Sequence, residues 1–317
     1  MGKPKKRVNP KVTSKVNQNI KELTLKTAVK FIRKMPQPYE KRRRGRRPHD
    51  PKVVTLLCLL MVSLNLTLDG IVSEMSDPRI KQLLNVEKLP SRSALHRGMQ
   101  KLSQKYIRRF NNYIVRRFLK KGFTLVVDST GFRLKSSSAW YDIRIRRKNE
   151  KKDNSKLHIA IEIRRNTIVS FKITSHKRND SPQLKFLLKN LHFFRRVIGD
   201  SAYLSRQNCD IVVEKDGKPF FHLKKNTTGK AKGSRAWKKM VKLATECKEA
   251  FDRVYHLRSQ IEGVNSSLKR RYGSCLRAVK RRTRNVVLSL KVVAYNIKQL
   301  LYDQVARQLR VPFWIKY

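Results

Sequence analysis

Acidic residues are scarce in this chain of 317 residues, and their scarcity dominates its electrostatics. There are 22 Asp and Glu against 76 Lys and Arg, which gives a formal net charge of +54 at pH 7 and an isoelectric point near 11.0. Self-repulsion on this scale is unfavourable unless a polyanion is bound. A globular chain that is this basic predicts a nucleic acid, in the first place double-stranded DNA, as its partner.

Glycine, proline and cysteine are also few. With 12 Gly and 11 Pro, the sequence is unlike collagen or low-complexity chains. The four cysteines show no C-x-x-C spacing and no histidine at zinc-finger distance, which argues against a disulfide framework or a structural zinc. The basic N-terminus has no apolar segment behind it, so we expect no secretory signal and a cytoplasmic, nucleoid-associated protein.

No uncharged run is long enough to predict a membrane span. The longest, residues 53–68, falls short of the roughly 18 apolar residues that mark a span, and we interpret it as a buried helix. Residues 51–121 predict an all-helical DNA-binding region, because apolar residues recur at helical spacing from Leu95 to Phe118. Ser91 or Ser93 would cap this helix, Gly122 would end it, and residues 91–101 would enter the major groove as part of a helix-turn-helix. Ordinary helix packing gives the same pattern.

Two basic clusters are candidate DNA contacts. Residues 1–50 form a basic N-terminal arm that ends in a block of arginines; such a block is either a solvated tail or a contact to phosphates or the minor groove. A second cluster, residues 224–239, surrounds Trp237 and predicts a DNA track. The residues predicted to bind DNA in these clusters are Arg44, Arg46, Arg47, Lys238 and Lys239.

From residue 123 onward the pattern predicts an α+β fold with a mixed sheet. Short apolar or alternating segments predict strands at 123–127, 141–147, 157–163, 167–174, 195–198 and 219–223, with a turn at 164–166. Helices are expected from 180 to about 191, at about 234–272 and at 284–309. We therefore expect a catalytic domain over residues 122–317.

Two acids follow apolar strands and need an explanation in so basic a chain. Asp128 follows the apolar residues of V-V-D-S-T-G-F, and Asp200 follows those of V-I-G-D-S-A-Y. If the two strands are neighbours, both carboxylates emerge at one edge of the sheet, where a bound cation would explain them. The structural alternative is that each Asp caps the following turn. Asp180, just before Ser-Pro, is interpreted as a helix N-cap.

A third acid lies on the long predicted helix after residue 234. At about 100° per residue, Tyr255, Arg258, Glu262 and Lys269 fall within roughly 60° of arc, beside an apolar stripe at 254, 257, 261, 264 and 268. Alone, this pattern favours an amphipathic helix with an Arg258–Glu262 ion pair. With the two strand-end acids upstream, it indicates a surface that binds metal and phosphate.

These blocks carry a specific resemblance. With D-S-T-G-F and G-D-S-A-Y upstream, the spacing Y-x2-R-x3-E-x6-K resembles the DDE transposases of bacterial and archaeal insertion sequences, in the Y-R-E-K group of the insertion-sequence four/five type. The likeness covers about residues 122–300 and implies an RNase H-like mixed sheet flanked by helices. The implied catalytic, metal-binding triad is Asp128, Asp200 and Glu262. The implied phosphate contacts are Tyr255, Arg258 and Lys269.

Carboxylate ligands without a thiolate or histidine cluster favour Mg²⁺, with Mn²⁺ as a substitute. Two such ions would activate water or a 3′-hydroxyl and stabilise the leaving oxygen. We expect Asp128 to bridge the ions, Asp200 to bind one and Glu262 the other. The predicted activity is cleavage of transposon ends and their transfer to target DNA by a homodimer.

Two other functions are compatible with parts of the sequence. A tyrosine recombinase would use a Tyr nucleophile and an Arg-His-Arg clamp, for which His192-x-x-Arg195 offers one piece. EDTA separates this mechanism from the carboxylate mechanism, because only the latter needs metal. A non-catalytic DNA-binding protein, such as a decayed transposase, would bind with a steep salt dependence and would not nick DNA.

Overall fold

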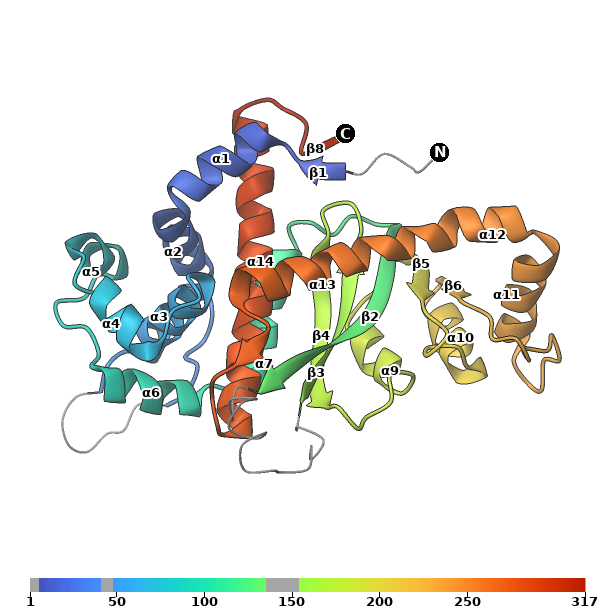
Figure 1. The fold of residues 1–317 in the computed structure, drawn as a ribbon, viewed down its shortest axis with the longest axis horizontal. Coiled ribbons are helices and arrows are strands. Elements are labelled where there is room, and N and C mark those ends of the chain that lie inside the picture. The colour runs from blue at the N-terminus through green and yellow to red at the C-terminus, as the bar shows by residue number, and fades with distance from the viewer. Residues whose placement is uncertain (1–5, 41–47, 135–153, 317) are drawn as a thin grey trace, which may run out of the picture. The chain divides into compact units, whose positions relative to one another are not determined.

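The computed structural model describes residues 6–40, 48–134 and 154–316. The chain divides into two compact units (Figure 1). Unit 1 consists of Met1–Ile114 together with Ala278–Tyr317, and unit 2 is Val115–Arg277. This division differs from the expected domain at 122–317, because the last forty or so residues of the chain group with the N-terminal segment.

A mixed β-sheet forms the centre of unit 2. Its strands lie in the order β4-β3-β2-β5-β6, and their bounds are β2 Phe123–Leu134, β3 Ser155–Glu162, β4 Thr167–Ser175, β5 Phe194–Gly199 and β6 Lys218–Phe221. Strands β2, β3 and β4 pair antiparallel, whereas β5 pairs parallel with β2 and with β6. A short strand, β7 (Cys275–Leu276), pairs with the end of β2. The predicted mixed sheet is confirmed; the strand expected at 141–147 lies outside the described residues.

The sheet forms where β-branched and aromatic residues run together. Val126 and Val127 of β2 and Ile198 of β5 are fully buried, as expected for strands covered on both faces. The hairpin between β3 and β4 turns at the predicted place, where Asn166 takes a positive φ of 52°, a conformation that Asn tolerates.

Helices flank this sheet. They are α9 (Gln183–Leu188), α10 (Arg206–Val213), α11 (Arg235–Glu246), α12 (Lys248–Tyr255) and α13 (Ser259–Tyr272). Helix α9 packs on β3 and β4, α10 on β6 and α13 on β2. Helix α13 buries Ile261, Val264 and Leu268, which confirms the inner part of the apolar stripe. The region expected to be helical at about 234–272 is helical but divided: the chain breaks at Cys247 between α11 and α12, and a 3₁₀ turn at His256–Arg258 separates α12 from α13.

Unit 1 contains most of the remaining helices. They are α1 (Pro10–Gln18), α2 (Ile20–Ile32), α3 (Pro51–Ser63), α4 (Leu68–Glu74), α5 (Pro78–Leu84), α6 (Arg92–Lys101), α7 (Gln104–Val115) and α14 (Arg281–Gln308). Helix α14 packs on α1, α2, α3 and α6, which explains why the C-terminal segment joins this unit. The unit also has strands, since β1 (Lys6–Val8) pairs with β8 (Trp314–Lys316).

The interpretation of residues 1–50 as an arm is wrong over much of its length. Helix α2 buries Leu25, Ala28 and Ile32, which are spaced as one helical face. The density of cations concealed this face in the sequence. Arg44, Arg46 and Arg47 lie outside the described residues.

The long periodic segment from Leu95 to Phe118 is two helices rather than one. Ser91 caps α6 as predicted, accepting a hydrogen bond from the backbone N–H of Ala94. The chain becomes extended at Leu102, and Ser103 then accepts a hydrogen bond from the N–H of Tyr106. The apolar residues keep their helical spacing across this break, but the capping Ser103 marks where the second helix begins.

Helix α3 is buried along its length, as the sequence predicts, with Leu57 and Cys58 fully inaccessible. Among the described residues, no single helix is long and apolar enough to cross a bilayer, and α3 and α4 pass that test only as a pair bent by 107°.

Candidate active site

Asp128 and Asp200 belong to neighbouring strands of the sheet. Strands β2 and β5 are parallel, and the last pair in their register is Val126 with Ile198. Asp200 directly follows β5, whereas Asp128 lies inside β2, which continues to Leu134 and pairs Asp128 with Ile159 of β3. The expectation that this strand ends at Asp128 is therefore wrong, but both aspartates lie two residues beyond the last β2–β5 pair. The condition on which the sequence argument depended, that these two strands are adjacent, is confirmed.

Asp128 is a partly buried carboxylate with one strong side-chain partner. The amide of Asn265 on α13 donates to Asp128 Oδ2 over 2.9 Å. Burial raises the pKa of Asp128, the N–H of Ser129 opposes this shift, and the negative charge of Asp200 raises the pKa further. The carboxylate is therefore a site where a cation would relieve both desolvation and repulsion.

Asp200 combines the two roles that the sequence left open. Its Oδ1 accepts a hydrogen bond of 3.0 Å from the N–H of Ala202, so it does cap the following turn. Its charge also acts on Asp128, and its second oxygen has no hydrogen bond to another described residue. The capping contact fixes the side chain at the strand end.

Glu262 does not join these two aspartates in the structure. It forms the i,i+4 ion pair with Arg258 at 3.2 Å, and its side chain is 62% exposed. Within the described ranges, no group of three or more His, Cys, Asp or Glu side chains is close enough to hold a metal ion. Three carboxylates without a cation repel one another, and Arg258, which also lowers the pKa of Asp128, competes for Glu262.

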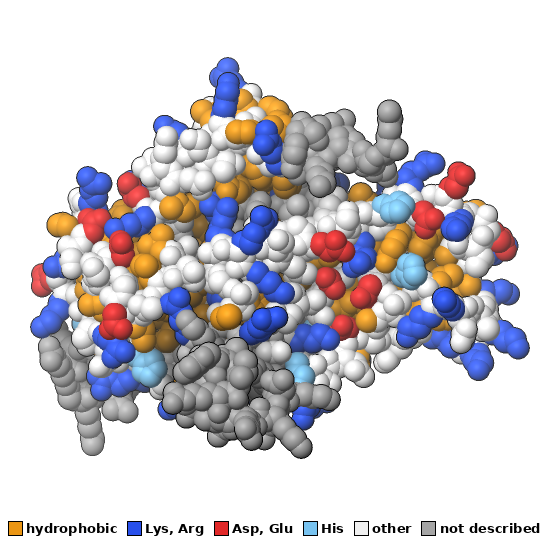
Figure 2. Space-filling model, in the orientation of Figure 1, with side chains coloured by type: hydrophobic (Ala, Val, Ile, Leu, Met, Phe, Trp, Pro, Cys, Tyr) orange, Lys and Arg blue, Asp and Glu red, His pale blue; other side chains and the backbone are white. Residues whose placement is uncertain are grey.

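The two other signature residues are held by aromatic contacts. The Tyr255 ring stacks on Phe251 with centroids 6.0 Å apart and lies 5.4 Å from the ring of His222; burial raises the pKa of its hydroxyl. The ammonium of Lys269 lies 5.8 Å from the centroid of Phe132 on β2. On the face drawn in Figure 2, acidic side chains gather where α13 passes the end of the sheet, with Lys and Arg around them.

Asp180 has a different role from the predicted one. Helix α9 begins at Gln183 and has no side-chain cap. The Asp180 carboxylate instead lies 2.7 Å from Lys156 Nζ and 3.2 Å from His158 Nδ1, and it accepts a hydrogen bond of 3.1 Å from the Ser129 hydroxyl. Sequence reasoning missed this cluster because its members come from three separate segments.

Asn265 was also missed, although its position gave a usable signal. It lies three residues after Glu262, on the border between the apolar and polar stripes of α13, and it is buried. A buried amide beside a partly buried carboxylate is a hydrogen-bonding partner by default.

The second basic cluster divides into exposed lysines and a buried tryptophan. Lys238 and Lys239 are exposed on α11. Trp237 is only 6% exposed, donates its indole N–H to the carbonyl of Thr228 over 2.9 Å and lies under the Arg206 guanidinium. It is therefore a packing residue of this unit.

The model of the family described as "Transposase DDE domain" matches residues 121–297, which is more than half of the chain. The chain belongs to the DDE transposase family. This transposase therefore acts on DNA by strand cleavage and strand transfer, and its family generally uses divalent metal ions. The tyrosine-recombinase alternative is set aside by this family membership.

One solved structure similar to the transposase is a cryo-EM structure of the piggyBac transposase synaptic complex with hairpin DNA. The two are 10% identical, with a TM-score of 0.45 over 93% of this chain and 74% of that chain. No curated protein matches the sequence.

Proposed function

We propose that the transposase belongs to the insertion-sequence group with the Y-R-E-K signature, and that it binds the ends of its element and joins them to target DNA. We further propose that its core is RNase H-like. The strand order β4-β3-β2-β5-β6 supports this, with three antiparallel strands followed by two parallel ones.

One observation carries the proposal: Asp128 and Asp200 each lie two residues beyond the last pair of the adjacent parallel strands β2 and β5, and Arg258 of the signature acts on both Asp128 and Glu262. A cation placed among these groups would neutralise the aspartates and could displace Arg258 from Glu262. The three acids would then share one ion-binding surface.

The donor set fits hard divalent cations, because all three side chains offer only carboxylate oxygens. Asp128, Asp200 and Glu262 would together hold the ions, Mg²⁺ in the first place, and Mn²⁺ would substitute. Bound ions would supply a nucleophilic water or 3′-hydroxyl and shield the leaving oxygen. Asn265 orients Asp128 through its hydrogen bond, and Arg258 holds Glu262 through their ion pair.

The remaining signature and basic residues would hold DNA. Tyr255, Arg258 and Lys269 border the acids on the same helical segment, and Lys238 and Lys239 extend the cationic surface along α11. Since two element ends must be joined, we propose a homodimer on DNA. Sizing of the protein with and without paired ends would test the dimer.

The test of the active site uses matched glutamates. Glu262 and Glu246 are both exposed and both form an i,i+4 ion pair, the latter with Lys242 at 3.5 Å. We would incubate the full chain and its Glu262→Gln, Glu246→Gln, Asp128→Asn and Asp200→Asn variants with duplexes carrying the element ends and Mg²⁺. Free 3′-hydroxyls and joined products are scored.

We expect no cleavage by the variants at 128, 200 and 262, unchanged cleavage by Glu246→Gln, and DNA binding by all of them. EDTA should stop the reaction. Cleavage that survives Glu262→Gln would overturn the triad. Binding without cleavage by the unaltered chain would favour a decayed transposase that only binds DNA.

A further inference from the structure

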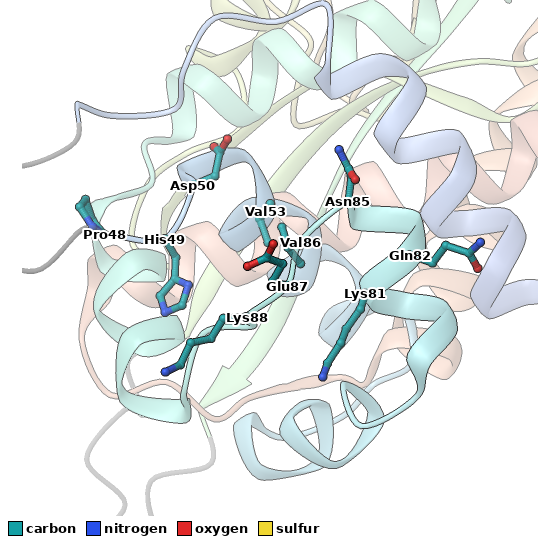
Figure 3. A pocket seen from close by; sticks show the side chains of 10 residues that line it. All are labelled: Pro48, His49, Asp50, Val53, Lys81, Gln82, Asn85, Val86, Glu87 and Lys88. Atoms are coloured by element: carbon teal, nitrogen blue, oxygen red, sulfur yellow. The ribbon is translucent and has the colours of Figure 1, made fainter.

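Two adjoining hollows lie in unit 1. Most of their lining residues precede the segment matched by the transposase family, and Lys280, Arg282 and Thr283 fall within it. The first, with a volume of about 1160 Å³, lies among α6, the chain before α3 and the start of α14. The second, with a volume of about 900 Å³, lies between α5 and the start of α3 (Figure 3). They share Pro48, His49 and Lys88 in their linings, so together they make one groove.

The groove is lined by six cations and by three acids, Glu40, Asp50 and Glu87. Its lysines and arginines are all exposed: Lys81, Lys88, Arg97, Lys101, Lys280 and Arg282. Within the described part of the chain, none of the six forms an ion pair with Asp or Glu. Figure 3 shows the ammonium ends of Lys81 and Lys88 extending toward the same side. Unpaired cations gathered in a hollow are costly unless an anion occupies it.

The groove is built from segments far apart in the sequence. Ala94, Arg97, Gly98 and Lys101 line it at helical spacing i, i+3, i+4 and i+7 of α6. The Arg282 guanidinium, at the start of α14, donates to the carbonyl of Lys101 over 3.4 Å. The C-terminal segment thus completes a surface begun by the N-terminal helices.

Close packing holds α6 in place. A Cβ atom on Gly98 would lie 2.6 Å from Val54 Cγ1 on α3 and 2.9 Å from the Tyr39 hydroxyl. The ammonium of Lys101 lies 5.6 Å from the centroid of the Tyr39 ring. The half-buried Tyr39 is therefore a wall of the groove rather than a platform for unpaired bases.

We propose that this groove binds the phosphate backbone of duplex DNA. The inference rests on the proposed function. It adds that a surface which includes Lys280 and Arg282 binds DNA. The number and spread of the cations fit a polyanion, and the absence of an exposed aromatic ring among the lining residues favours backbone contact.

The test compares two quadruple variants of the full chain. Arg97→Gln, Lys101→Gln, Lys280→Gln and Arg282→Gln together alter the groove. Lys11→Gln, Lys15→Gln, Lys30→Gln and Lys34→Gln remove the same charge from exposed, unpaired positions elsewhere in unit 1. Duplex affinity is measured by fluorescence anisotropy across a salt series. The groove variant should bind at least about tenfold more weakly, with a salt slope smaller by about 3 to 4, while the control changes little.

Equal affinities of the two variants would overturn the proposal. A second measurement needs no variant: bound duplex should protect Lys88, Lys101 and Lys280 of the unaltered chain from acetylation, while Lys11 and Lys15 stay reactive. Lack of protection would also overturn it.

The outcomes separate the groove from the proposed function. If the unaltered chain cleaves DNA but the groove fails both tests, only the groove assignment is wrong. If the unaltered chain neither binds nor cleaves DNA, the proposed function is wrong.

A second, independent observation concerns Asp180. Its partner Ser129 directly follows Asp128, and the β2–β3 register sets Ser129 opposite His158, another Asp180 partner. His158 in turn lies 2.8 Å from the Thr174 hydroxyl on β4. One carboxylate thereby ties together three strands at the level of the proposed metal ligand.

We infer that Asp180 is a positioning residue that fixes the part of β2 that carries Asp128. It is not itself a free ligand, because Lys156, His158 and Ser129 already occupy its oxygens. Asp180→Asn and Ser129→Ala should weaken Mn²⁺ binding, followed by electron paramagnetic resonance on the DNA-free protein, by about 10- to 100-fold. Cleavage should become half-maximal at correspondingly higher metal concentrations.

Glu162 supplies the matched control. It is a buried carboxylate on β3 whose oxygens accept hydrogen bonds from the N–H groups of Arg164 and Arg165. Glu162→Gln should lower thermal stability without changing Mn²⁺ affinity. Should Ser129→Ala bind Mn²⁺ as tightly as the unaltered chain, Asp180 is structural only.

Discussion

Asn265 on α13 donates its side-chain amide to Asp128 on β2 over 2.9 Å, although 137 positions separate the two residues in the chain. The contact joins α13 to β2: Asn265 faces the Asp128 carboxylate, while Glu262, almost one turn earlier, faces outward to Arg258. The position of the Asp128 carboxylate therefore depends on a residue that carries no charge.

Asn265→Ala should weaken both the fold and the reaction. It leaves a part-buried carboxylate oxygen without its donor, which costs about 1–3 kcal/mol, and it frees Asp128 to turn. We expect a lower midpoint in urea unfolding and slower cleavage of element ends. Ser266→Ala, at the exposed neighbouring position, should change neither; equal effects of the two substitutions would contradict the role of the hydrogen bond.

Arg258→Gln should shift the pH dependence of cleavage. Burial already raises the pKa of Asp128, and the positive charge of Arg258 opposes that rise. Without Arg258 the pKa of Asp128 rises further, so the carboxylate stays protonated to higher pH. The acid limb of the pH–rate profile should move toward neutral pH. Lys269→Met provides the comparison, and an acid limb that moves equally in both variants would refute this reasoning.

Asp180 should contribute to stability in a pH-dependent way. Burial alone would raise the pKa of Asp180, but hydrogen bonds from His158 and Lys156 outweigh it and lower the pKa to about 2. Because the folded-state pKa lies below the ordinary 3.8, the stabilisation is complete above about pH 4 and disappears as the pH falls toward 2. It amounts to something on the order of 2 kcal/mol.

The pH dependence can be measured by urea unfolding of the unaltered chain and Asp180→Asn at pH 5 and pH 2.5. The stability difference between the two proteins should be large at pH 5 and small at pH 2.5. A difference that does not change between these pH values would show that the ionised carboxylate is not what stabilises the fold.

Trp237→Phe should reduce stability and leave single-stranded DNA affinity unchanged. The substitution removes the hydrogen bond to the Thr228 carbonyl and shrinks a buried side chain, at a cost of about 1–3 kcal/mol. Thermal unfolding and anisotropy with a single-stranded oligonucleotide measure the two effects. A selective loss of affinity for single-stranded DNA would mean that the indole does reach bases.

The sequence by itself determined the strands of the core and the positions of two acids. Alternating or continuous apolar residues marked β3, β4 and β5, and Asn166 marked the hairpin turn, because these signals arise from neighbours in the chain. The same locality explains why Asp200 could be placed at the end of its strand and why the Arg258–Glu262 pair was foreseen as an alternative. The strand end predicted at Asp128 is wrong, because pairing with β3 continues β2 to Leu134. The basic composition determined the class of partner, since charge is a sum over residues and needs no fold.

Only the tertiary structure decided which distant groups meet. The contacts of Asp128 with Asn265 and of Asp180 with Ser129, Lys156 and His158 join segments whose separation carries no periodic signal. The grouping of α14 with the N-terminal helices follows from burial of its apolar residues, which could equally have covered the sheet. Which packing forms depends on the free energy of the whole folded chain. Local sequence patterns do not contain this information, because the free energy sums contacts between distant segments.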